Sequence, residues 1–122
     1  MAVFGAPGEV PDPAGQALAA TRRIQERLRT ELPECAAAVG VAAGPAVAGN
    51  VGDERRFEYT VIGDPVNEAA RLAELAKTLP GRIVASLSAV RLAAPEEQKH
   101  WQAGDSVVLR GRDQPTVLAV LG

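Results

Sequence analysis

Apolar and polar residues alternate along residues 57–62, whose sequence is FEYTVI. A period of two places the aromatic and aliphatic side chains on one face of an extended chain, with Glu58 and Thr60 on the other. The pattern therefore predicts a β-strand that is buried on one side. Further strands are predicted at residues 2–4, 36–44 and 82–86, and a terminal β-hairpin is predicted at residues 105–122.

Helices are predicted at two aspartates that are each followed by proline, Asp12 and Asp64. Aspartate is favoured as the residue that caps a helix N-terminus, and proline is favoured at the first helical position. The first helix is expected to extend to about Leu32 and the second to about Leu79, because proline follows each of them. A shorter helix is predicted after Ser88, which can cap it.

The order of these elements favours an α+β fold with a mixed sheet. Strands alternate with helices along most of the chain, but the last two strands pair with each other. Residues 45–56 are expected to form a turn-rich connection because they carry several glycines, a proline and charged residues. The length of 122 residues fits one domain that spans residues 1–122.

Composition excludes several classes of protein. The net charge of −2 gives no overall basic field, which argues against nucleic acid and anionic membranes as partners. No apolar run reaches the roughly 18 residues of a membrane-spanning helix, and the N-terminus lacks the features of a secretion signal. The single cysteine, Cys35, and the single histidine, His100, leave no internal disulfide and no cluster of histidines or cysteines for a metal. We expect a reducing, cytoplasmic setting.

The junction between the strand at residues 57–62 and the following helix is the first candidate for chemistry. A helix N-terminus presents free backbone N–H groups and a positive dipole end, which favour phosphate. Asn67 and Arg71 are four residues apart and share one helix face. An amide and a guanidinium together can bind phosphate oxygens or stabilise a developing negative charge. Thr60 is expected nearby, on the polar face of the strand.

The same spacing supports a second interpretation in which the junction has no chemical role. Asn67 then satisfies the backbone of a turn, and Arg71 pairs with Glu68 or Glu74 in water. Spacing alone leaves both interpretations open.

The segment FEYTVIGDPVNEAARL resembles the signature of class III nucleotidyl cyclases, the adenylate and guanylate cyclases, and in particular their mycobacterial-type branch. The segments AVFGAP, VGVAAGPAVAGNVG and VVLRGRDQPTVLAV also resemble this family, so the likeness covers essentially the whole chain. The resemblance implies a ferredoxin-like core, in which helices pack on a mixed sheet. It implies cyclic nucleotide signalling by conversion of ATP or GTP to a 3′,5′-cyclic nucleotide and pyrophosphate.

The resemblance also implies roles for individual residues. Asn67 matches the family's residue that orients the ribose, and Arg71 matches the residue that neutralises charge on the α-phosphate. Thr60 matches the position that reads the purine edge. Arg112 matches a basic residue that holds the terminal phosphates, although a solvated turn residue is the alternative for it.

Two aspartates that bind Mg²⁺ or Mn²⁺ in the complete family domain precede the strand that AVF matches, so both positions lie outside this sequence. Asp64 is better explained as a helix cap than as a metal ligand. We therefore expect no metal site in this chain, a fold that is incomplete at its N-terminus, and no useful activity of the chain alone.

Partners follow from the family's assembly, in which head-to-tail dimers build each site from two subunits. A homodimer, or a heterodimer with another cyclase domain, can then supply the missing aspartates. The alternative is a non-catalytic pseudo-cyclase module that pairs with another cyclase chain and tunes it. Residues 53–56 match a region that extends toward the dimer partner.

Overall fold

A four-stranded mixed sheet lies at the centre of the computed structural model, which describes residues 2–5, 10–31, 37–44, 47–53 and 56–122. The elements in chain order are α1 (Pro13–Glu31), β1 (Val39–Val41), β2 (Val47–Asp53), β3 (Arg56–Ile62), α2 (Asp64–Ala76), β4 (Ile83–Ser86), α3 (Leu87–Leu92), α4 (Pro95–Gln98), β5 (Trp101–Val107) and β6 (Thr116–Leu121). The strand order in the central sheet is β1-β4-β6-β5.

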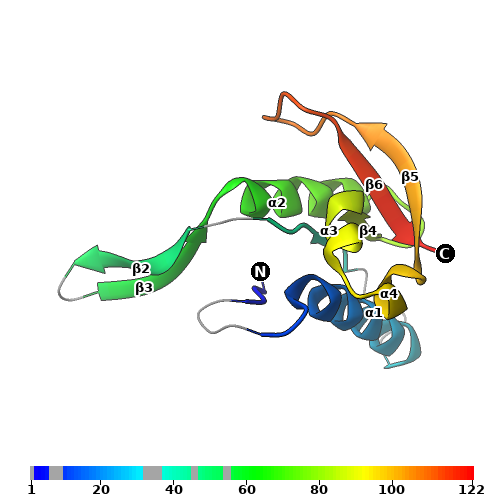
Figure 1. Ribbon diagram of the computed structural model, residues 1–122, viewed down its shortest axis with the longest axis horizontal. Helices are drawn as coiled ribbons and strands as arrows, with labels where there is room; N and C mark the ends of the chain where they lie inside the picture. Colours follow the sequence, from blue (N-terminus) through cyan, green and yellow to red (C-terminus); the bar gives the residue numbers. More distant parts are fainter. Residues whose placement is uncertain (1, 6–9, 32–36, 45–46, 54–55) are drawn as a thin grey trace.

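The pairing within this sheet is mixed. β1 runs parallel to β4, with Val39 opposite Ile83, while β6 runs antiparallel to both β4 and β5. β2 and β3 form a separate antiparallel ribbon that projects away from the sheet (Figure 1). The predicted α+β class with a mixed sheet is confirmed. The predicted terminal hairpin is confirmed as β5 and β6, although β5 already begins at Trp101.

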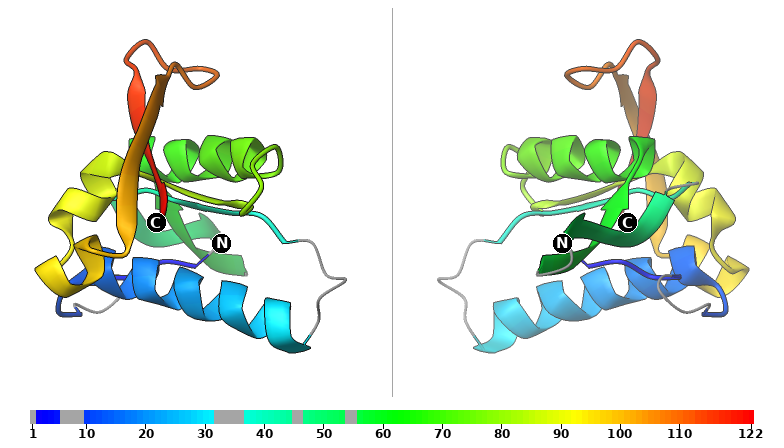
Figure 2. Two further views of the ribbon diagram at one scale, coloured as in Figure 1. Left: turned by 90° about the vertical axis from the view of Figure 1, so that its right-hand side faces the viewer. Right: turned by 90° about the vertical axis from the view of Figure 1, so that its left-hand side faces the viewer.

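Two apolar clusters pack on opposite faces of the sheet, because successive side chains of a strand point to opposite faces. In β4, Ile83 and Ala85 belong to one cluster with Leu18 of α1, and Val84 belongs to the other with Leu72 of α2. Helices α1 and α2 therefore cover opposite faces of the sheet, as both views in Figure 2 show. The position of α2 on its own face determines where the candidate site lies.

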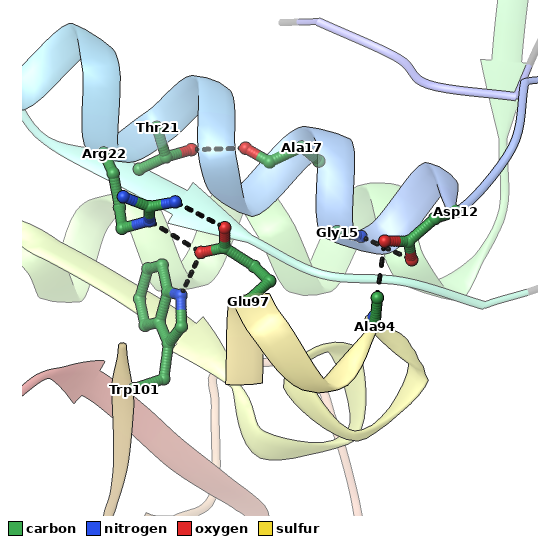
Figure 3. Close-up of polar contacts among 8 residues, drawn as sticks. All are labelled: Asp12, Gly15, Ala17, Thr21, Arg22, Ala94, Glu97 and Trp101. Atoms are coloured by element: carbon green, nitrogen blue, oxygen red, sulfur yellow. Dashed lines mark hydrogen bonds and ion pairs between the residues drawn. The ribbon is translucent and has the colours of Figure 1, made fainter. Parts of the chain in front are cut away.

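Asp12 caps α1, as its sequence context predicts. Its Oδ1 accepts a hydrogen bond of 3.1 Å from the Gly15 N–H, and its Oδ2 accepts one of 3.3 Å from the Ala94 N–H (Figure 3). Its φ of 49° lies in the left-handed region, which aspartate tolerates better than most residues. One side chain thus joins the start of α1 to the start of α4. Figure 3 also shows Glu97 of α4 between Arg22 of α1 and Trp101 of β5.

Three local predictions outside the β3–α2 junction are wrong. Residues 2–4 are not in a strand, and the part of the chain that the structure describes offers them no neighbouring strand, so Val3 and Phe4 are exposed. The turn-rich connection predicted at residues 45–56 contains β2, which pairs with β3. Ser86 rather than Ser88 caps α3, since its Oγ accepts a bond of 3.2 Å from the Ala89 N–H.

Candidate functional site

Gly63 makes the junction between β3 and α2. Its φ of 154° and ψ of 173° lie in a region that is essentially restricted to glycine. Its carbonyl oxygen accepts hydrogen bonds from the Val66 N–H at 3.1 Å and from the Asn67 N–H at 3.3 Å. The prediction that Asp64 caps this helix is therefore wrong. Gly63 is the cap residue, and Asp64 is the first helical residue. The Asp64 carboxylate pairs with Arg112 instead of capping the helix.

Asn67 and Arg71 lie on one stripe of α2, as their spacing predicts. Asn67 is exposed, and the side chain of Arg71 is 34% exposed. Nη1 of Arg71 donates hydrogen bonds to both carboxylate oxygens of Glu74, at 3.1 and 3.4 Å. Since Glu74 is itself mostly exposed, this ion pair is weak and an incoming anion can replace it.

Arg112 reaches α2 from the turn between β5 and β6. The Arg112 N–H donates a 3.0 Å bond to the Leu109 carbonyl, and Gly111 between them has a φ of 83°. A positive φ at the third position is the requirement of a type II turn, which glycine meets without strain. The turn directs the Arg112 side chain against α2, where it is only 19% exposed. Arg112 is thus not a solvated turn residue.

Two carboxylates of α2 hold the Arg112 guanidinium. Nη2 lies 3.2 Å from Oδ2 of Asp64, and Nη1 donates to Oε2 of Glu68. The Thr116 hydroxyl donates a 3.2 Å bond to the same oxygen of Glu68. Glu68 is therefore a buried charge that is paired with one cation and hydrogen-bonded to one hydroxyl, as a buried carboxylate requires.

Helix geometry places these groups on neighbouring stripes within the first eight residues of α2. Positions three residues apart on an α-helix lie about 60° apart around its axis. The stripe formed by Asp64 and Glu68, which holds Arg112, is consequently adjacent to the stripe formed by Asn67 and Arg71. Three of the residues predicted for the site, Asn67, Arg71 and Arg112, thus lie on or against neighbouring stripes of one helix.

Thr60 lies in the β2–β3 ribbon, three residues before Gly63. Its backbone pairs in register with Gly49 of β2. Its side chain lies outside what the structure describes, so its predicted role in reading a purine stays a prediction.

The residues that the structure describes do not make a donor set for a divalent ion. No group of three or more histidine, cysteine, aspartate or glutamate side chains lies together among them. Asp64, the acidic residue of the junction, is paired with Arg112. None of the described helices is long and apolar enough to cross a membrane.

Two hollows of about 310 and 400 Å³ are found elsewhere on the described part of the chain. The first lies between α1 and the turn at Gly81, and the second lies beside Asp12 and Glu97. Neither is lined by Asn67, Arg71 or Arg112.

Sequence reasoning did not find the roles of Glu68 and Thr116. A signal for Glu68 was present, because Leu72 and Ala76 follow it at intervals of four, and both are fully buried. A carboxylate on the buried stripe of a helix predicts a buried cationic partner. Nothing in the sequence identified that partner as Arg112, which is 44 residues away.

Comparison with known sequences gives a consistent result. The sequence profile described as "Adenylate and Guanylate cyclase catalytic domain" matches residues 2–122. The uncharacterized protein Rv1318c of Mycobacterium tuberculosis is 58% identical over 119 residues, which are 98% of this chain and 22% of the relative. The uncharacterized protein Rv1320c of the same organism is 57% identical over 115 residues, 94% of this chain and 20% of the relative. The chain spans about a fifth of the length of these curated relatives.

Solved structures share the fold. The crystal structure of the guanylyl cyclase Cya2 aligns with a TM-score of 0.71 and 25% identity, covering 95% of this chain and 61% of that chain. The structure of a bacterial light-regulated adenylyl cyclase aligns with a TM-score of 0.74, covering 90% of this chain and 33% of that chain. At 18% identity, this second likeness concerns the fold alone.

Proposed function

The chain belongs to the family of adenylate and guanylate cyclase catalytic domains, and we propose that it forms a nucleotide-binding half of a class III cyclase site. The observation that carries this proposal is the placement of Asn67 and Arg71 on one stripe of α2, with Arg112 held against the adjacent stripe. An amide, an exchangeable guanidinium and a second guanidinium on neighbouring stripes of one helix suit a ribose with a polyphosphate.

Each residue of this half-site has a separate task in the proposal. Asn67 orients the ribose, and Arg71 leaves Glu74 to stabilise the charge that grows on the α-phosphate. Arg112 binds the terminal phosphates, and Thr60 contacts the purine edge of ATP or GTP. In the family's reaction the ribose 3′-oxygen attacks the α-phosphorus, and the bond from that phosphorus to the bridging oxygen breaks to release pyrophosphate.

We propose further that residues 1–122 alone do not turn over nucleotide. The family's reaction draws on Mg²⁺ or Mn²⁺, which activates the nucleophile and screens the triphosphate. The described residues do not fit such an ion, since they hold no group of three ligating side chains. Loss of a single oriented electrostatic group already costs about 10²–10³ in rate. The missing ligands then come from a longer chain or from a second cyclase domain in a homodimer or heterodimer.

A complementation assay tests this proposal. The chain is mixed with a complete class III cyclase domain that retains its metal-binding aspartates but carries alanine at its own transition-state Asn and Arg. We expect each protein alone to make no cyclic nucleotide from ATP or GTP, and the mixture to make it. The variant Arg71→Ala should not complement, whereas Arg110→Ala, an exposed arginine near the same turn, should.

Other outcomes would overturn parts of the proposal. Turnover by the chain alone contradicts its inactivity. Complementation that survives Arg71→Ala contradicts the role of Arg71. The chain can also be mixed with an unsubstituted cyclase domain. If wild type and Arg71→Ala both change the activity of that domain, the chain is a pseudo-cyclase module that acts by contact alone. The projecting β2–β3 ribbon (Figure 1) is then the first surface to vary in search of that contact.

A further inference from the structure

The two carboxylates that hold Arg112 differ sharply in exposure. The side chain of Glu68 is 8% exposed, and that of Asp64 is 68% exposed. They bind different nitrogens of the same guanidinium, since Nη1 faces Glu68 and Nη2 faces Asp64. The two partners of Arg112 therefore have different physical roles, although they carry the same charge.

We propose that Asp64 occupies the place of a phosphate oxygen on Arg112 and is displaced when an oligophosphate binds, while Glu68 is a positioning residue that keeps Arg112 in place. This inference rests on the proposed function, because it concerns how the same half-site receives the phosphates of its nucleotide. It adds a competing group and a supporting group to that site.

Asp64 is suited to leave. An exposed carboxylate that loses its partner becomes fully hydrated, so the exchange leaves no buried charge uncompensated. The incoming phosphate brings more negative charge and can accept two parallel hydrogen bonds from a guanidinium. Asp64 thus keeps the Nη2 side of Arg112 neutralised and correctly oriented until a stronger anion replaces it.

Glu68 is suited to stay. Its Oε2 accepts hydrogen bonds from both Arg112 and Thr116, and the side chain lies beneath the helix surface. Separating Arg112 from it would leave a buried carboxylate without its counter-charge, which is strongly unfavourable. Glu68 therefore holds Nη1 while Nη2 exchanges partners. An arginine whose position is fixed in this way loses less conformational entropy when it binds a phosphate.

Simple electrostatics makes a different prediction. If both carboxylates only repelled the phosphate, neutralising either one would tighten binding. Under our proposal the two neutralising substitutions have opposite effects. Asp64→Asn tightens binding of an oligophosphate by about two- to fivefold, the range for removing an exposed ion pair. Glu68→Gln weakens it several-fold, because Arg112 loses its fixed position.

The experiment titrates inorganic tripolyphosphate into the wild-type chain and into these two variants. Binding is followed by NMR through the Nε–H signal of the Arg112 side chain and through its backbone amide. Asp113→Asn is the matched control, since it removes one exposed negative charge beside Arg112 in the sequence. If Glu68→Gln does not fold, Thr116→Val takes its place. That variant removes one hydrogen bond from Glu68 without changing its charge, and it should weaken binding.

Opposite changes in affinity for Asp64→Asn and Glu68→Gln, with Asp113→Asn near wild type, support the inference. The inference is overturned if both variants change affinity in the same direction or if neither variant changes it. It is also overturned if Arg112 does not respond to tripolyphosphate in any of the proteins. A parallel titration with ATP keeps the proposed function separate. Shifts at Asn67 and Arg71 with ATP preserve the nucleotide half-site even if Arg112 never responds. Absence of these ATP-induced shifts contradicts the half-site, even if Asp64→Asn and Glu68→Gln change tripolyphosphate affinity in opposite directions.

Discussion

Arg22 of α1 and Glu97 of α4 form a two-point ion pair. Nε of Arg22 lies 2.7 Å from Oε2 of Glu97, and Nη2 lies 2.6 Å from Oε1. Trp101 of β5 donates a 2.9 Å hydrogen bond from its indole N–H to the same Oε2 (Figure 3). One carboxylate that is 8% exposed thereby joins two helices and a strand.

Replacing Glu97 with alanine should destabilise the protein. The substitution leaves the buried Trp101 N–H without an acceptor and Arg22 without its counter-charge. Because the side chain of Arg22 is 31% exposed and regains water, we expect a loss of about 2 kcal/mol rather than the full cost of breaking a buried pair. Urea unfolding measures the difference. The control is Glu96→Ala on the same helix, where the side chain is exposed and the change should be within about 0.5 kcal/mol.

The same cluster predicts a dependence of stability on pH. Burial raises the pKa of Glu97, but hydrogen bonds from Arg22 and Trp101, together with the charges of Arg22 and His100, outweigh it and hold the pKa below its ordinary value. Ionised Glu97 therefore stabilises the fold above its unfolded pKa of about 4.3, and this contribution is lost as the pH falls through the lower folded-state pKa.

The stability difference between wild type and Glu97→Gln should accordingly be largest near neutral pH and shrink as the pH is lowered below about 4.3. Urea midpoints of both proteins between pH 3 and pH 7 provide the comparison. A difference that stays constant over this range would show that the charge of Glu97 does not contribute, and that only its shape or hydrogen bonds matter.

Asp12→Ala should cost about 2 kcal/mol of folding stability. The substitution removes the cap of α1 and the acceptor for the Ala94 N–H, and alanine is strained at a φ of 49°. Asp12→Asn is the matched variant, because asparagine tolerates the same φ and its single side-chain oxygen can still cap the Gly15 N–H. Its NH2 group cannot accept the hydrogen bond from the Ala94 N–H, so we expect a thermal midpoint between those of wild type and Asp12→Ala. Equal losses for both variants would argue that the second carboxylate oxygen or the charge matters rather than the cap.

Gly40→Ala should be severely destabilising. A Cβ at this position of β1 would lie 2.6 Å from the Ala69 carbonyl oxygen and would also clash with the Ala73 backbone, so β1 and α2 would have to separate. The expected loss is about 3 kcal/mol, in the range of an overpacked core. Gly104→Ala in β5 is the control, since its Cβ would meet Leu118 atoms only at 3.7 Å and beyond. Similar midpoints for both variants would contradict the close packing of α2 on β1.

Local sequence patterns predicted the elements that carry a strong signal in their own residues. The alternation in residues 57–62 gave β3, and Asp12 gave the start of α1. β2 was missed because glycine, alanine and asparagine dominate it and no alternation is present. Its pairing with β3 is made by backbone hydrogen bonds, which do not depend on side-chain type.

The candidate site was predicted only in part, for a related reason. Asn67 and Arg71 are four residues apart, so their shared stripe follows from helix geometry alone. The pairing of Arg112 with Glu68 crosses 44 residues and depends on how the β5–β6 turn meets α2. The context of Asp64 is typical of a cap and predicts one there. Gly63 is the cap residue instead, in a backbone conformation that is essentially restricted to glycine, and Asp64 pairs with Arg112.

The measurement that tests the central claim most directly is an ATP titration of the wild-type chain, with and without Mn²⁺, followed by backbone amide NMR. A nucleotide half-site predicts saturable shifts at Thr60, Asn67, Arg71 and Arg112, and their loss in Arg71→Ala but not in Arg110→Ala. No shifts at millimolar ATP, or shifts that the Arg71 substitution leaves unchanged, would contradict the claim that this face of α2 binds nucleotide.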